Sequence, residues 1–352
     1  MRLKRNGMIL GKVIGASGAT GFYSRKEYPN QKIFEYIPGY VLKGMYKRTK
    51  TATLEKEIGN LRFKEDGITL ADRFPDCIYV DFFKRFILNA VGLSNPGIIE
   101  LLRRGIWQQW SESFIISIAA IKGSTFERAE EISEIAKIIK MHLKEFCGFF
   151  AIEINESCPN KKDGQNSSTK EILLHLEIVS SILEDIPLIP KISLLTSPEE
   201  ARKISEHPAC DAISLTNSIP FGAMPEEINW EWLFRPNGSG FVDASGFFSS
   251  VECTYWDPEG KTQSPLARYG GGGLSGKPLF NPGCNWLKKA EHVDILKPLI
   301  MGAGINNEHD VEILSKFQPM VQAIAPSSAM ILSPWNMKSI IDAGNKLFKQ
   351  VW

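Results

Sequence analysis

The stretch FFAIEINESCPN, residues 149–160, joins a short apolar run to a polar turn. The apolar half predicts a buried β-strand, and the turn carries two amides and a thiol, those of Asn155, Asn160 and Cys158. Amides donate and accept hydrogen bonds, and a thiol acts as a base or nucleophile once it is deprotonated. A strand end with turn-forming residues and an inert cysteine would look the same, so the rest of the chain decides between the two interpretations.

Units of one strand and one helix recur on both sides of this stretch. Residues 114–119 have the apolar continuity of a buried strand, and a helix with an apolar face follows them. Continuous apolar strands that alternate with helices are typical of a parallel sheet. The other strands predicted in this way cover residues 12–14, 46–49, 188–194, 212–217, 298–301 and 321–325.

Capping residues mark where the predicted helices begin. A serine three residues before a glutamate has the spacing of a capping box, in which each residue bonds the backbone N–H of the other. The chain has this spacing at Ser124 and Glu127 and again at Ser168 and Glu171. Together with Ser197, which precedes a proline, and with later turn signals, these pairs predict helices that begin near residues 124, 168, 197, 307 and 333.

The number of units is sufficient for a closed (β/α)8 TIM barrel, an α/β fold. A doubly wound open sheet is the alternative. No G-x-G-x-x-G lies between a first strand and a helix, which counts against a dinucleotide-binding Rossmann unit. We expect residues 1–352 to form one domain. Within it, residues 221–270 form a long irregular insertion after the sixth strand; a surface insertion with its own aromatic cluster is favoured over a lid or an oligomer contact.

Composition excludes several classes of function. The net charge of +1 gives no basic field for nucleic acid. The six cysteines have no C-x-x-C spacing and the five histidines form no ligand pair, so no metal site is expected. The basic N-terminus lacks the apolar run of a signal peptide, and no apolar stretch approaches the roughly 20 residues of a membrane span. We therefore expect a cytoplasmic protein.

Small and polar residues follow the predicted strands, where a barrel holds its reactive groups. Two of them, Lys50 and Lys191, would be costly in a barrel mouth unless they met negative charge. The N1–O2 edge of a reduced flavin carries such charge. The turns after the last two strands suit a phosphate, because small residues let backbone N–H groups approach an anion; ordinary tight turns are the alternative.

These residues, in this order, resemble those of the dihydroorotate dehydrogenases, which are FMN-dependent barrels of pyrimidine biosynthesis. The resemblance runs from about residue 14 to the eighth strand. It rests on residues 16–18, 49–55, 59–60, 89–93, 155–160, 191, 216–218, 272–276 and 304–305.

The resemblance implies that the chain oxidises (S)-dihydroorotate to orotate. Cys158 would be the catalytic base that removes the C5 proton, while the C6 hydride passes to N5 of FMN. The substrate would be bound by Asn89, Val91, Gly92, Leu93, Asn155, Asn160, Asn217 and Ser218. FMN would be bound by Ala16, Ser17, Lys50, Lys191, Gly276, Gly304, Ser327 and Ser328.

A cysteine base is the class 1 pattern, which implies a homodimer and leaves room for an electron-transfer partner subunit. The oxidant stays open between fumarate, a quinone, and NAD reached through a partner. Glu156 stands where the family has an apolar residue, and its charge would raise the pKa of Cys158 if the side chain pointed inward.

Two other functions compete with this interpretation. A dihydropyrimidine dehydrogenase-like enzyme would share the barrel and the cysteine, but that family usually has histidine at the position of Asn160. The altered phosphate turns and Glu156 would also fit a non-catalytic flavin barrel that serves as a binding or partner subunit. The intact cysteine, lysine and asparagines argue against that.

Overall fold

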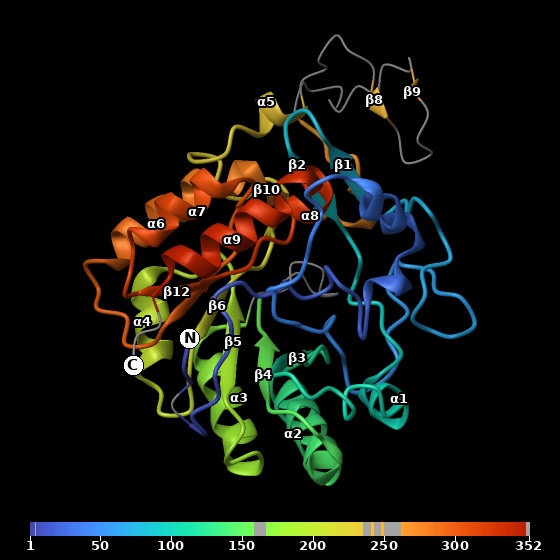
Figure 1. Ribbon diagram of the computed structural model, residues 1–352. Helices are drawn as coiled ribbons and strands as arrows, with labels where there is room; N and C mark the ends of the chain where they lie inside the picture. Colours follow the sequence, from blue (N-terminus) through green and yellow to red (C-terminus); the bar gives the residue numbers. More distant parts are fainter. Residues whose placement is uncertain (4, 158–166, 235–240, 243–247, 250–261, 350–352) are drawn as a thin grey trace.

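The centre of the protein is a six-stranded parallel sheet with the order β12-β11-β6-β5-β4-β3 (Figure 1). The computed structural model describes residues 1–3, 5–157, 167–234, 241–242, 248–249 and 262–349. All neighbouring strands of this sheet are parallel, as the alternation of strands and helices predicts. The strands are β3 (Phe114–Ile118), β4 (Phe150–Asn155), β5 (Leu188–Ile192), β6 (Ile213–Leu215), β11 (Leu299–Met301) and β12 (Val321–Ile324).

The first two predicted strands are wrong as strands, because in the described residues each makes only isolated bridges. Val13 pairs with Ile324 at one edge of the sheet, Ile14 pairs with Tyr46, and Arg48 pairs with Ile115 at the other edge. Glycines at positions 11 and 15 flank the first segment, and glycine in a strand weakens it. The two edges of the sheet are therefore linked through two short segments, 13–14 and 46–48.

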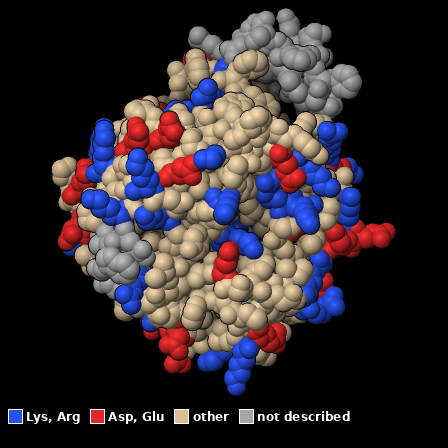
Figure 2. Space-filling model, in the orientation of Figure 1, with Lys and Arg blue, Asp and Glu red and all other residues tan. Residues whose placement is uncertain are grey.

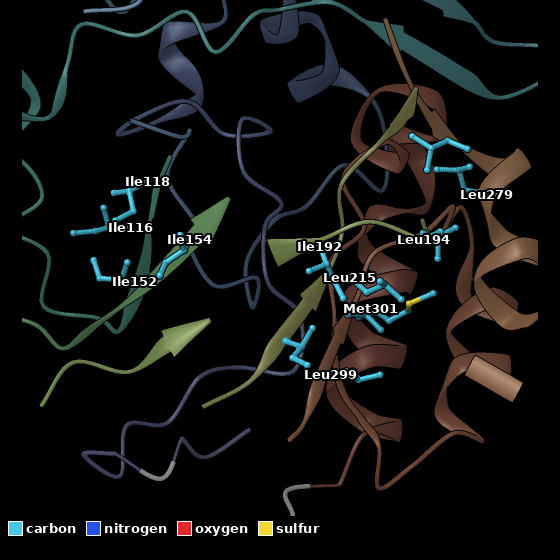
Figure 3. Close-up of a cluster of buried hydrophobic side chains, with 14 of the residues drawn as sticks. Ile116, Ile118, Ile152, Ile154, Ile192, Leu194, Leu215, Leu279, Leu299 and Met301 are labelled. Carbon is cyan, nitrogen blue, oxygen red and sulfur yellow. The ribbon is translucent and has the colours of Figure 1, made fainter. Parts of the chain in front are cut away.

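Alternation along the strands gives the sheet two different apolar faces. The outer face carries residues such as Ile116, Ile152 and Leu215, which share one buried cluster with the helices (Figure 3). The inner face carries a second cluster, to which four residues near the N-terminus contribute. That inner cluster comprises Met1, Leu3, Met8, Leu10, Ile14, Ala16, Ile115, Ala151, Ile189, Ala212, Ile300, Ala323 and Ala325.

Helices follow the strands and cover the outer face of the sheet (Figure 1). Their bounds are α1 (Ile98–Arg103), α2 (Thr125–His142), α3 (Thr169–Ile182), α4 (Pro198–Glu206), α5 (Trp230–Phe234), α6 (Phe280–Ala290), α7 (Glu308–Ser315), α8 (Ala329–Leu332) and α9 (Met337–Leu347). Short 3-10 helices span Arg25–Glu27, Pro29–Tyr36, Leu143–Glu145, Ala267–Tyr269, Lys277–Leu279 and Pro334–Asn336.

The predicted helix starts are confirmed, with one difference in capping. The full capping box is present at Ser124 on α2, and Ser197 caps α4 in the same way. On α3, Ser168 accepts a hydrogen bond from the backbone of Glu171, but the Glu171 carboxylate pairs with Arg128 of α2 instead of returning to the cap. A charged partner within reach outcompetes the backbone N–H, because ionic hydrogen bonds are the stronger ones.

A second sheet, which the sequence did not reveal, is antiparallel with the order β1-β2-β10-β7. Its strands are β1 (Ile78–Asp81), β2 (Phe86–Asn89), β7 (Ile219–Pro220) and β10 (Gly273–Gly276). Figure 1 shows β1, β2 and β10 above β4 and β5. These strands are short and β10 is rich in glycine, so they carry little apolar alternation. Strand β7 precedes the predicted insertion 221–270 and β10 follows it, so both ends of the insertion lie next to strands of this sheet.

The insertion begins with an aromatic cluster that packs on the second sheet. Trp230 and Phe234 of α5 contact Phe221, and Phe234 also contacts Tyr79 of β1 and Phe86 of β2. The cluster is therefore part of the main core and does not belong to the insertion alone. Farther along, β8 (Phe241–Val242) and β9 (Phe248–Ser249) pair antiparallel, and the remainder of 235–261 lies outside the described residues.

Charge is evenly distributed on the visible face of the molecule. Basic and acidic side chains are interspersed in Figure 2, in keeping with the net charge of +1. Among the residues that the structure describes, each helix is too short or too polar to cross a bilayer.

Replacement of a core isoleucine tests the outer-face packing. Ile152→Ala removes a fully buried side chain from β4 and is expected to lower the free energy of unfolding by about 2–5 kcal/mol, because a cavity remains. Urea denaturation measures this. The control Ile99→Ala, on α1 with 59% of its surface exposed, should change stability by less than about 0.5 kcal/mol. Equal effects of the two substitutions would contradict the assignment of β4 to the core.

Candidate active site

One cavity of about 750 Å3 lies at the carboxyl ends of the parallel strands, beneath the second sheet. Carboxyl ends of parallel strands meet at one edge, so residues distant in sequence converge there. The cavity brings together most of the predicted site residues: Ala16, Ser17, Lys50, Asn89, Val91, Leu93, Asn155, Lys191, Asn217, Ser218, Gly276, Gly304, Ser327 and Ser328. Gly92 is not in its wall, and Cys158 and Asn160 lie outside the described residues.

Two amides and three hydroxyls form a connected polar floor in the cavity. Asn217, two residues after β6, donates through Nδ2 to Oδ1 of Asn155 at 2.8 Å and to Oγ of Ser157 at 2.8 Å. Asn155 in turn donates to Oγ1 of Thr51 at 3.2 Å, whose hydroxyl is 2.9 Å from that of Ser17. Such a network fixes the direction in which each amide presents its remaining groups.

Asn89 brings a third amide from the opposite wall. It is the last residue of β2, and its Nδ2 donates to the carbonyl of Gly273 on β10 at 3.2 Å. The antiparallel sheet therefore holds this side chain above the floor formed by Asn155 and Asn217. A planar ligand with polar edges could be bound between the two walls.

Two buried ammonium groups line the same cavity. Nζ of Lys50 donates to the carbonyl of Ser94 at 2.6 Å, and this lysine is 6% exposed. Nζ of Lys191 lies 3.9 Å from Oε1 of Glu153, and this lysine is 5% exposed. Ammonium groups on a cavity wall attract anions, so the donor set fits an anionic, planar group such as a flavin mononucleotide.

Two glycines allow the β10 and β11 turns to approach closely in the cavity wall. Gly304 has φ of +68°, and a Cβ there would lie 2.7 Å from the carbonyl oxygen of Gly276 and 2.5 Å from the backbone nitrogen of Phe280. Gly276 has φ of +109°, and a Cβ would lie 2.5 Å from the carbonyl oxygen of Arg85. Only glycine satisfies both the positive φ and the close approach.

Glu156 points away from the cavity. Its carboxylate lies 3.0 Å from Nδ1 of His175 on α3, with both side chains buried. His175 Nε2 is 3.9 Å from Glu171, which is paired with Arg128. The condition under which Glu156 would raise the pKa of Cys158, an inward-pointing side chain, is therefore not met.

Sequence reasoning missed a buried charge pair directly beneath the floor. Arg48 and Glu153 are 2.6 Å apart and have no exposed surface. The sequence contained a signal for this pair. Arg48 lies two residues before Lys50 and Glu153 two residues before Asn155, so each is expected on the same strand face as a predicted site residue. Also missed was the apolar part of the cavity, which includes Tyr28, Phe34, Leu61, Leu70, Phe74 and Tyr79.

Known proteins resemble the chain over its length. It is 25% identical to a protein named dihydroorotate dehydrogenase B (NAD(+)), catalytic subunit, from Endomicrobium trichonymphae, over 96% of this chain and 88% of that protein. A protein of the same name from Thermotoga maritima is 28% identical over 58% of this chain and 63% of its own length. No family model matches the sequence.

Solved structures share the fold. The structure of a DHODH from Eimeria tenella in complex with ferulenol has a TM-score of 0.59 at 15% identity, covering 97% of this chain and 82% of that one. Its ligand-free form has a TM-score of 0.55 at 16% identity, covering 97% and 87%. The fold and the cavity define an α/β protein with a small-molecule site at its strand ends. The similarity to relatives of this name, which for one of them extends over nearly the full length of both chains, supports the dihydroorotate dehydrogenase family.

A pair of glycine substitutions tests the tight wall. Gly304→Ala is expected to lower the free energy of unfolding by about 1–3 kcal/mol more than Gly18→Ala, because the new methyl group overlaps backbone atoms. Gly18 is the matched control, since it also lines the cavity at positive φ (+86°) but has nothing within 4 Å of a Cβ. Equal losses, measured by urea denaturation, would contradict the close approach of the two turns.

Proposed function

We propose that the chain is an FMN-dependent dihydroorotate dehydrogenase with a class 1-type cysteine base. The observation that carries this proposal is the convergence of three amides and two buried lysines on one cavity. We also propose that the six parallel strands and the segments 13–14 and 46–48 together act as a single-domain (β/α)8 barrel, with the isolated bridges as support.

The substrate would lie between the two walls of the cavity. Dihydroorotate is a six-membered ring that carries amide-like edges and a carboxylate, so it requires both donors and acceptors. Asn155 and Asn217 would bind the ring from the floor and Asn89 from the opposite wall, assisted by Asn160 and Ser218. The backbone near Gly92 and Leu93 would take the carboxylate.

FMN would be bound by Lys50, Lys191 and the small residues of the wall. When bound, this cofactor supplies the acceptor for the hydride that leaves C6 of the substrate. Lys191 would place positive charge where negative charge develops, which is an electrostatic contribution that needs no reorganisation. Gly276, Gly304, Ser327 and Ser328 would lie along the phosphate side.

Cys158 would move the proton. It follows Ser157, whose hydroxyl accepts a hydrogen bond from Asn217 at the cavity floor. The proton at C5 is α to a carbonyl, and Sγ of Cys158, as the thiolate, would accept it while the C6 hydride leaves. No charged residue is required at position 156 for this step, in keeping with the outward direction of Glu156.

We further propose that the electrons leave through a partner subunit. The names of the curated relatives, which are catalytic subunits of NAD(+)-dependent enzymes, support this. The class 1 pattern supports a cytoplasmic homodimer as the catalytic unit.

Removal of the thiol tests the proposed chemistry. Cys158→Ala is expected to keep bound FMN and to bind orotate, but to slow reduction of FMN by dihydroorotate about 10²–10⁴-fold at neutral pH, because a general base is lost. Anaerobic stopped-flow absorbance measures the rate. Cys147→Ala, which removes an exposed thiol outside the cavity, is the control and should match the wild-type rate. A Cys158→Ala protein as fast as wild type would contradict the role of the base.

A further inference from the structure

The inner face of the sheet is apolar at the cluster and becomes polar and charged two residues farther along the strands. Ile115, Ala151 and Ile189 belong to that cluster. Two residues farther along the same strands stand Ser117, Glu153 and Lys191, all buried. Arg48 occupies the same level on segment 46–48, two residues after Tyr46, which packs on the cluster. A charged layer therefore lies between the sealed base and the cavity.

Glu153 is shared unequally between two cations. Its Oε2 is 2.6 Å from Nη1 of Arg48, whereas its Oε1 is 3.9 Å from Nζ of Lys191. The hydroxyl of Ser117 also donates to Oε1, at 3.0 Å. Coulomb attraction falls with distance, so the charge of Glu153 is neutralised mainly by Arg48.

Arg48 is held in place on the opposite side of the layer. Nη1 donates to Oγ of Ser214 at 3.0 Å and to Oγ1 of Thr216 at 3.3 Å. Thr216 and Lys191 both line the cavity, so the pair lies directly behind the wall that faces the cofactor. Burial lowers the pKa of the Arg48 guanidinium and the Glu153 carboxylate opposes that shift; arginine stays charged in proteins.

A buried ion pair is a weak means of stabilising a fold, because desolvation offsets most of the attraction. The pair has a larger effect on the electrostatic environment of the neighbouring cation, Lys191. Without Arg48, the carboxylate of Glu153 would have Lys191 as its nearest cation and would cancel its charge. With Arg48 present, the three side chains sum to one positive charge.

We propose that Arg48 is a positioning residue that sets the reduction potential of the bound flavin by neutralising Glu153. The net charge of Arg48, Glu153 and Lys191 then stays at plus one beside the reduced, anionic flavin. This inference rests on the proposed binding of FMN and adds a residue that does not itself touch the cavity.

The test is the midpoint potential of FMN bound to four proteins, measured by spectroelectrochemistry at saturating FMN. They are the wild type, Arg48→Met, Glu153→Gln and the double variant. Methionine keeps an unbranched side chain, and glutamine keeps an acceptor for Ser117. The charge of the layer falls by one in the first variant, rises by one in the second and is unchanged in the double variant.

Opposite shifts are expected. Arg48→Met should lower the potential and Glu153→Gln should raise it, each by the equivalent of roughly a tenfold change in the two-electron equilibrium, about 30 mV. The double variant should return close to the wild-type value. A purely structural role would not give shifts of opposite sign that cancel.

Other results overturn the inference. Shifts of the same sign, no shift, or a double variant displaced as far as a single variant would each contradict it. If Arg48→Met fails to fold, the potentials of Glu153→Gln and the double variant still test the inference, because the double variant should have the lower potential of the two. A wild-type protein that binds no FMN would refute the proposed function itself, whereas bound FMN with an unchanged potential would refute only the role of Arg48.

Discussion

The register of the parallel strands determines the chemistry of this protein. Ser117 pairs with Glu153, and Asn155 pairs with Lys191. Because side chains alternate between the two faces, this register places one row of polar groups inside the sheet and one row of branched apolar groups against the helices. A shift of one residue in either strand would exchange the two rows and remove the site.

The buried polar groups of the inner face are connected to one another, although Nε and Nη2 of Arg48 make no hydrogen bond among the described residues. The network runs from Arg48 and Glu153 through the Ser117 and Thr51 hydroxyls to Asn155. Connected hydrogen bonds strengthen one another in the low-dielectric interior. Below this layer, the inner apolar cluster seals the base; above it lies the cavity. The arrangement therefore exposes the functional side chains on one side only.

Much of this arrangement could be predicted from sequence, because local patterns dominate in it. The apolar strands at 114–118 and 150–155 and the capping serines at 124 and 197 are local signals, and they are confirmed. Lys50 and Lys191 line the same cavity, as could be predicted from their places near the ends of predicted strands. The second sheet could not be predicted, because β10 pairs with β2 across more than half of the chain and has no apolar alternation. The partner of Glu156 was also hidden, since His175 lies one helix away.

The most direct test is the visible spectrum of the purified chain with FMN, before and after anaerobic addition of dihydroorotate. A cavity with three amides and two buried cations is expected to bind the flavin. A near-stoichiometric amount of dihydroorotate is then expected to bleach the flavin absorbance. Dihydrouracil is the matched compound that lacks the carboxylate, and it should leave the band unchanged. A flavin band that dihydroorotate fails to bleach, or no flavin bound at all, would contradict the account.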